Sequence, residues 1–271
     1  MIQFNIMTSF FVIWFFKNYM AKRWIIMNNN SQNLLYNKEV RKGCKDIFHA
    51  FMVKGAEFDG YYDIPFIPES FNLEINILLP YDKTYKHIYE PGEIVHFYLD
   101  DQKFDGPKGI WNGLSKNESF KRGFDLSRFD GAEAIITPDF SLYLDMPRVM
   151  QIWNVYRSRV VGYYLTTLGY KVIPNVRWTD EESYDFAFAG LYEGQIVAVG
   201  TLGCSKEILD KILLVNGFIE MIKRIKPKQV IIYGPICKEL QFVIDKCNVN
   251  IKQFDSDISL FYGGNADGNE E

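Results

Sequence analysis

The sequence predicts an α/β protein with a mostly parallel sheet, because strand and helix patterns alternate along its second half. The clearest unit covers residues 134–178, where a short apolar strand, a long helix and a second strand follow one another. Such a unit is parallel and right-handed in nearly all known cases. The alternation continues to residue 254. We therefore expect a partial or distorted (β/α) barrel first and an open doubly wound sheet second.

The elements before residue 134 are less regular. Pro65 interrupts a short apolar run and favours a first or edge strand there. An EIVHFYL strand at 93–99 is rich in β-branched and aromatic residues. The segment 103–129 reads as a long excursion with a helical turn, and such excursions are often functional loops.

The central helix of the α/β unit is expected to begin at Asp145, with Pro147 in its first turn, and to end at Gly169. Its apolar stripe has the spacing of one helical face and consists of Val149, Trp153, Tyr156, Val160 and Tyr164. Asn154 and Arg157 share a face, and Arg159 is assigned to the polar side, which is usually solvated in such helices.

The remaining strands are expected at 171–176, 195–200, 229–233 and 250–254. Thr179 is a candidate N-cap for a helix whose first turn is acidic. Ser205 is a candidate N-cap for the next helix, and a further short helix is expected at 239–247. The residues of the Ser205 helix expected to face the core are Leu209, Ile212, Val215, Ile219 and Ile222.

The domain organisation follows from composition. Residues 1–26 contain an FFVIWFF run that is shorter than the roughly 20 residues of a membrane span. We expect them to be an extension outside the fold, with an interfacial anchor as the alternative. Residues 27–55 form a polar segment and a helix, 56–255 a single α/β domain, and 256–271 a flexible acidic tail.

The totals fit a cytoplasmic globular protein. Of the 271 residues, 48% are hydrophobic and 24% charged, and the net charge is −4. The four cysteines lack the spacing of a zinc site. No metal site and no integral membrane span are predicted, and the sequence indicates neither a cofactor nor an oligomeric state.

A candidate site lies where the strands end, since ligands of parallel α/β folds bind at the carboxyl ends of the strands. Asp139 suits a general base or a metal ligand, or caps a turn. Arg177 suits an anionic group held in a fork, or pairs with Asp180 or Glu181. The other strand-end candidates are Asp100, Asp101, Asn175, Trp178, Thr201, Gly203, Cys204 and Tyr233.

The loop 200–207, GTLGCSKE, joins a strand to a helix N-terminus, where backbone N–H groups favour an anion. It lacks the lysine of a Walker A motif. Cys204 could have a lowered pKa at such a position, or could be a small buried hydrophobic residue.

Several motifs together resemble one family, in order and spacing. They are TPDFSLYLDMP, NVYRSRVVGYY, VIPNVRW, SYDFAFAGL, VAVGTLGC and IKPKQVIIYGP, and HFYLDDQKF resembles its upstream part. This is a domain-of-unknown-function family common in bacteriophages and bacterial integrative elements. The resemblance implies a mobile-element origin and a cytoplasmic setting but no chemistry. Its motifs contain the catalytic candidate Asp139. They also contain candidate ligand-binding residues, which are Asn154, Arg157, Asn175, Trp178 and Gly203.

The sequence favours one function and leaves two alternatives. The favoured function is a nucleic-acid-associated accessory protein, indicated by the implied origin, the many aromatic residues and the cations of the 103–128 segment. These cations are Lys103, Lys108, Lys116, Lys121, Arg122 and Arg128. The second is a hydrolase or lyase acting on a phosphorylated or nucleotide-like ligand at the strand ends. The third is a structural or host-interaction protein.

Overall fold

The structure is a computed structural model, and it describes residues 49–70, 73–114, 123–204 and 207–256. The chain divides into two units, residues 1–57 and residues 58–271. Of the first unit, the described part contains the short 3₁₀ helix η1 (Ala50–Val53). No helix among the described residues combines the length and apolar character that a membrane span requires.

The second unit contains two parallel sheets that continue one another. The four-stranded sheet has the order β3-β4-β5-β6, and the three-stranded sheet has the order β7-β8-β9. Their strands are β3 (Ile77–Pro80), β4 (Glu93–His96), β5 (Ala134–Ile136), β6 (Val172–Ile173), β7 (Ile196–Gly200), β8 (Gln229–Tyr233) and β9 (Asn250–Phe254). A parallel bridge between Asn175 and Ala198 joins the sheets. A separate antiparallel pair precedes them, β1 (Phe58–Asp59) with β2 (Ile64–Pro65).

The strands therefore lie side by side in sequence order. The order does not reverse, as that of a doubly wound sheet would. Among the described residues, no backbone pairing joins β3 to β9, so the array is not a closed barrel. The α/β class is confirmed, and the order matches the partial barrel rather than the doubly wound alternative.

Side chains from the whole array meet in one interior cluster. It includes Ile94 of β4, Ile136 of β5, Ile173 of β6 and Ile231 of β8. Leu78 of β3 and Phe254 of β9 pack against the same cluster, although these strands stand at opposite ends of the array. The curled array is thus held by apolar side chains where strand pairing is absent.

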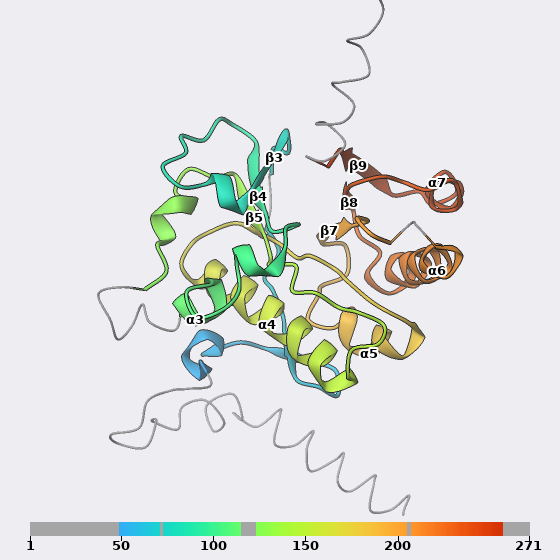
Figure 1. Cartoon of the computed structure of the whole chain (residues 1–271), viewed down its shortest axis with the longest axis horizontal. Coiled ribbons are helices and arrows are strands. Elements are labelled where there is room, and N and C mark those ends of the chain that lie inside the picture. The colour runs from blue at the N-terminus through green and yellow to red at the C-terminus, as the bar shows by residue number, and fades with distance from the viewer. Residues whose placement is uncertain (1–48, 71–72, 115–122, 205–206, 257–271) are drawn as a thin grey trace, which may run out of the picture. The chain divides into compact units, whose positions relative to one another are not determined.

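The alternate side chains of the strands face outward, under the helices. Val197 and Val199 of β7 and Val230 of β8 pack in a second cluster with residues of the helices. Burial on both faces is the usual condition of a parallel sheet. The helices are α3 (Ile110–Leu114), α4 (Arg148–Thr167), α5 (Tyr184–Ala187), α6 (Ile208–Ile225) and α7 (Lys238–Ile244) (Figure 1). Short 3₁₀ helices are η2 (Tyr81–Lys83), η3 (Asp101–Lys103), η4 (Leu126–Phe129) and η5 (Glu181–Ser183).

The central helix α4 buries a different face from the one expected. Val149 is 71% exposed and Trp153 44%, and Val160 is the one member of the expected stripe that is fully buried. The other buried apolar side chains are Val155, Val161 and Leu165. The buried face also carries polar side chains, which are Gln151, Asn154, Ser158 and Arg159. Apolar spacing failed here because this face is fixed by hydrogen bonds to loops rather than by hydrophobicity alone.

The start of α4 also differs from the expectation. Pro147 is the N-cap, and the helix begins at Arg148 rather than at Asp145. Within the helix, Gly162 allows a close approach, since a Cβ there would stand 2.6 Å from side-chain atoms of both Ile67 and Thr137. The helix therefore packs tightly on the strand-end segment after β5.

Helix α6 is likewise rotated relative to the expectation. Leu209, Ile212 and Ile219 are exposed, whereas the buried positions are Leu214, Gly217, Phe218, Met221 and Ile225. The other two expected core residues, Val215 and Ile222, are partly buried against the core. The ring of Trp178 fills the space beside Gly217, where no side chain of α6 would fit.

The expected caps of two helices also differ. Ser205 lies outside the described residues, and Glu207 caps α6 through a reciprocal pair of bonds with Asp210. Asp180, not Thr179, is the N-cap of η5. The Thr179 hydroxyl instead donates to Gln151 Oε1 at 2.8 Å.

Candidate functional site

The strand-end residues Asp139, Asn175 and Arg177 are brought together after β5 and β6. Arg177 Nη1 donates to Asp139 Oδ2 at 2.7 Å, and Asn175 Nδ2 donates to Asp139 Oδ1 at 2.8 Å. Both carboxylate oxygens of Asp139 are therefore held in place. The expected pairing of Arg177 with Asp180 or Glu181 is wrong, since Arg177 pairs with Asp139 and it is Arg148 that pairs with Asp180.

Two tyrosines extend this group into a network. The Tyr98 hydroxyl, just beyond β4, donates to Asn175 Oδ1 at 3.1 Å. Its ring stacks on that of Tyr233, with 5.0 Å between centroids and 10° between planes. Gly200 makes room for the Tyr98 ring, because a Cβ there would stand 2.7 Å from two of its carbons. The carboxyl ends of β4 to β8 thus form one assembly.

Burial and the neighbouring charge of Arg177 shift the pKa of Asp139 in opposite directions. Burial raises the pKa of its carboxyl above the ordinary value, and the charge of Arg177 only partly offsets this. Asp139 in turn raises the pKa of Arg177, which stays charged. Burial also raises the pKa of the Tyr98 hydroxyl, which stays protonated as a donor. The network therefore places a fixed cation next to a carboxyl group that holds a proton more readily than usual.

A buried arginine supports the network from beneath. Arg159 of α4 is 2% exposed, and it donates to the carbonyl oxygens of Asn175, Ala187 and Ala189 at 2.8, 2.9 and 3.1 Å. Burial lowers its pKa to about 9. Its bond to the Asn175 carbonyl fixes the backbone of the residue that orients Asp139. The assignment of Arg159 to a solvated face is wrong.

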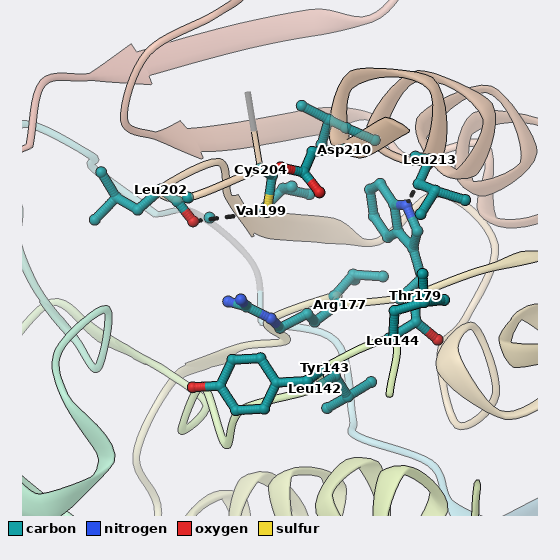
Figure 2. A pocket seen from close by; sticks show the side chains of 15 residues that line it. Leu142, Tyr143, Leu144, Arg177, Thr179, Val199, Leu202, Cys204, Asp210 and Leu213 are labelled. Carbon is teal, nitrogen blue, oxygen red and sulfur yellow. Dashed lines mark hydrogen bonds between the residues drawn. The ribbon is translucent and has the colours of Figure 1, made fainter. Parts of the chain in front are cut away.

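Two cavities open on the network, and Arg177 lines both of them. The Tyr98 cavity has a volume of about 490 Å³ and is lined by Asp82, Lys83, Tyr98, Leu99, Asp100, Lys103, Asp139, Ser141, Arg177, Gly200, Leu202 and Tyr233. The Trp178 cavity, about 360 Å³, is lined by residues 142–144, 176–179, 199, 200, 202–204, 210, 213 and 214. Figure 2 shows Arg177 among the residues that line this second cavity.

The guanidinium of Arg177 has donor capacity left for a ligand. Its side chain is 24% exposed, against 10% for Asp139. Within the described part of the chain, its only hydrogen bond is the one to Asp139. An arginine offers five N–H donors in a planar fork that matches carboxylate and phosphate groups. The cavities are thus equipped to bind an anion.

The family follows from comparison with known proteins. The model of the family described as "Domain of unknown function (DUF4417)" matches residues 56–255. The chain belongs to this family. The match contains the whole strand-end network, from Tyr98 to Tyr233.

Two curated relatives are phage proteins. The chain is 32% identical over 176 residues to "Gene 1 protein" of Mycobacterium phage D29, covering 64% of this chain and 60% of the relative. It is 35% identical over 145 residues to "Gene 1 protein" of Mycobacterium phage L5, covering 54% and 58%. The match thus spans about three fifths of each relative's length. No solved structure matches the chain.

Asn154 and Arg157, expected as ligand-binding residues, brace the loop after β5. Asn154 Nδ2 donates to the Ser141 carbonyl at 2.7 Å. Arg157 pairs with Asp105 at 2.8 Å and lies over the Phe140 ring, 3.9 Å from its centroid. Neither residue lines the Tyr98 or the Trp178 cavity, although Asn154 borders a small cavity of about 10 Å³ that Arg177 also lines. Ligand binding by Asn154 and Arg157 in this DUF4417 domain stays a prediction.

Trp178 and Thr201 are strand-end candidates with mainly structural contacts. Trp178 Nε1 donates to the Leu213 carbonyl at 3.0 Å, while its ring also lines the cavity named after it. The Thr201 hydroxyl is buried and donates to the Tyr233 carbonyl at 3.3 Å. The Asp101 carboxylate accepts hydrogen bonds from the backbone N–H and the hydroxyl of Ser141. Asp101 lines neither the Tyr98 cavity nor the Trp178 cavity.

The loop after β7 does not give Cys204 a reactive thiol. Burial raises the pKa of Cys204, with Asp139 and Asp210 acting in the same direction and Arg177 against it. The suggestion of a lowered pKa is therefore wrong, because α6 begins only at Ile208, beyond Cys204. Gly203 and Cys204 line the Trp178 cavity, and Ser205 and Lys206 lie outside the described residues.

Two of the three described cations that were expected to bind nucleic acid are engaged within the domain, while Lys108 is exposed. Lys103 pairs with Asp82 at 2.5 Å. Arg128 donates to Tyr81 and Thr84, and its guanidinium lies 4.0 Å from the Tyr81 centroid. Lys116, Lys121 and Arg122 lie outside the described residues. Of the described cations in this segment, Lys108 therefore remains available at the surface, and Lys103 and Arg128 do not.

Sequence reasoning missed three contributors to the site. Tyr98 lies two residues before the strand-end candidate Asp100 but is not among the predicted residues. The Leu142–Leu144 stretch and Asp210 are also outside the prediction, although both line the Trp178 cavity. The position of Tyr98 at the carboxyl end of a predicted strand could have identified it. No local sequence pattern indicates that residues 142–144 or Asp210 line a cavity. Among the described residues, no cluster of His, Cys, Asp and Glu is suited to a metal ion.

Proposed function

We propose that the domain is an enzyme that binds a small phosphorylated ligand at Arg177 and transfers a proton through Asp139, in a hydrolase or lyase reaction. The observation that carries the proposal is the buried Asp139–Arg177 pair at the carboxyl ends of the strands, with Arg177 reaching two cavities. Ligands of parallel α/β folds bind at this end.

Arg177 supplies the anion recognition. Its remaining N–H donors can form a two-bond contact with a phosphate or carboxylate. The aromatic and aliphatic walls lower the local dielectric constant, which strengthens such a charge contact. The bond to Asp139 fixes the guanidinium before a ligand arrives, so less side-chain entropy is lost on binding.

Asp139 supplies the acid–base group. A general acid or base works best when its pKa is near the working pH, and burial shifts Asp139 in that direction. Each of its oxygens accepts one bond from Asn175 or Arg177 and keeps a second acceptor position. The carboxylate can therefore accept a proton from a water molecule in hydrolysis, or from a carbon atom in elimination.

The test is a ligand screen followed by turnover. The melting temperature of the full chain is measured with inorganic phosphate, sugar phosphates and nucleoside monophosphates. We expect phosphorylated compounds to raise it by binding the folded state. With the best of them as substrate, Asp139→Asn should keep binding but lose about 10²- to 10⁴-fold in turnover. No stabilising phosphorylated compound, or full turnover by the variant, would refute the proposal.

Nucleic-acid association stays a prediction, and the structure supports it less than the sequence alone does. Its local basis was the cationic 103–128 segment, and Lys103 and Arg128 are engaged inside the domain. Titration of DNA across salt concentrations tests it, because phosphate contacts release counterions and weaken as salt rises. Tight binding with a steep salt slope would favour this function over the small-ligand enzyme.

A further inference from the structure

The Trp178 cavity has the walls of a ring-binding pocket. It is bordered by apolar side chains from four segments, which are Leu142, Val176, Trp178, Val199 and Leu214. The indole nitrogen of Trp178 is already bonded to the Leu213 carbonyl. The ring therefore serves the cavity as an apolar surface. A volume of about 360 Å³ suits one small molecule or one part of a larger ligand.

Two charged groups of opposite sign also line this cavity, Arg177 and Asp210. Figure 2 shows Asp210 and Cys204 on one side of the cavity, with Arg177, Leu142 and Tyr143 on the other. Asp210 Oδ2 accepts from the Glu207 backbone N–H at 3.3 Å, within the capping box of α6. Among the described residues, Asp210 Oδ1 accepts no hydrogen bond, so it is available to a ligand.

We propose that the Trp178 cavity binds a nucleotide base that carries an amino group, with the amino group donating to Asp210 and the phosphate bound by Arg177. An ionised carboxylate only accepts hydrogen bonds, so it favours an amino group and disfavours a ring oxygen at the same place. The apolar walls select a flat, weakly hydrated ring. This inference rests on the proposed function, since both use Arg177.

The experiment compares three phosphates of increasing similarity to the proposed ligand. Calorimetric titration of the full chain uses ribose 5-phosphate, UMP and AMP. We expect AMP to bind at least about tenfold more tightly than the other two, as hydrogen bonds to a charged group allow. Equal affinity for all three would overturn the inference and leave phosphate binding at Arg177 intact. If none of them binds, the proposed function fails as well.

Two variants separate the base contact from the phosphate contact. Asp210→Asn keeps a side-chain oxygen for the α6 cap but loses the negative charge. It should weaken the affinity for AMP about tenfold and leave the affinity for ribose 5-phosphate unchanged. Leu144→Trp adds a bulky ring at a half-exposed position of the cavity lining and should likewise weaken AMP binding without weakening ribose 5-phosphate binding. Asp245→Asn, at the exposed end of α7, is the matched control. Unchanged AMP affinity in both cavity variants would overturn the inference.

Discussion

Asp139 and Arg177 form an ion pair with 2.7 Å between Oδ2 and Nη1, although 38 residues separate them in the chain. They meet because β5 and β6 are parallel neighbours whose carboxyl ends lie at one edge of the sheet. The pair is largely enclosed, yet Arg177 keeps donors that face two cavities.

The carboxyl of Asp139 should make the folded protein less stable as pH rises. Because burial raises its folded-state pKa, the folded state holds this proton more tightly than the unfolded state does. The contribution to stability is full below about pH 4 and declines as pH rises towards the folded pKa. Asp139→Asn removes this dependence. Denaturant unfolding of both proteins from acid to neutral pH should show wild type losing stability relative to the variant, and a parallel pair of curves would contradict it.

Arg159→Met should be strongly destabilising. The variant leaves three buried carbonyls without their donor, a loss of about 3–5 kcal/mol in the free energy of unfolding. Arg224→Met is the control, since Arg224 is 40% exposed and pairs with Glu220 and Asp185 at the surface. We expect the control to cost less than about 1 kcal/mol. Similar urea midpoints for the two variants would show that Arg159 is not the anchor described here.

Gly200→Ala should displace the Tyr98 ring. The added methyl group would lie 2.7 Å from two ring carbons, and overpacking of this kind costs about 1–3 kcal/mol. It should also break the Tyr98–Asn175 bond and so loosen Asp139. The double variant Gly200→Ala, Tyr98→Leu removes the obstructing ring and should melt at a higher temperature than Gly200→Ala alone. A double variant that is less stable than either single one would argue against this contact.

Truncation on α6 should distinguish its two faces. Phe218 is fully buried, whereas Ile212 is 50% exposed. Phe218→Ala should cost about 3–5 kcal/mol of stability, and Ile212→Ala well under half of that because little apolar area returns to water. Chemical unfolding measures both. Equal losses of stability would contradict the observed orientation of α6 and favour the orientation that the apolar spacing predicts.

The positions of most strands could be predicted from the sequence, and the helix faces could not. The strands β8 and β9 occupy the expected residues, and β8 is a short apolar run that ends before Gly234. The strand expected at 171–176 is shorter than predicted, since β6 covers only Val172–Ile173. Parallel topology then gathers Asp139, Asn175 and Arg177 without any knowledge of their contacts. On α4 the same apolar spacing misled, since Trp153 is partly exposed and Arg159 is buried.

The failure at Arg159 has a physical cause. A charged side chain is buried only when distant backbone groups satisfy it, and its three carbonyl partners lie 16 to 30 residues further along the chain. Local periodicity carries no information about such partners. The same holds for Asp210, which reaches the Trp178 cavity only through the placement of α6 on the sheet.

The central claim, that Arg177 binds the anionic group of a ligand, is tested most directly by Arg177→Lys. Lysine keeps the charge beside Asp139 but loses the planar fork. Calorimetric titration with AMP compares wild type, this variant and Arg224→Lys as a surface control. We predict affinity at least about tenfold weaker for Arg177→Lys and unchanged for Arg224→Lys. Wild-type affinity in Arg177→Lys would contradict the claim.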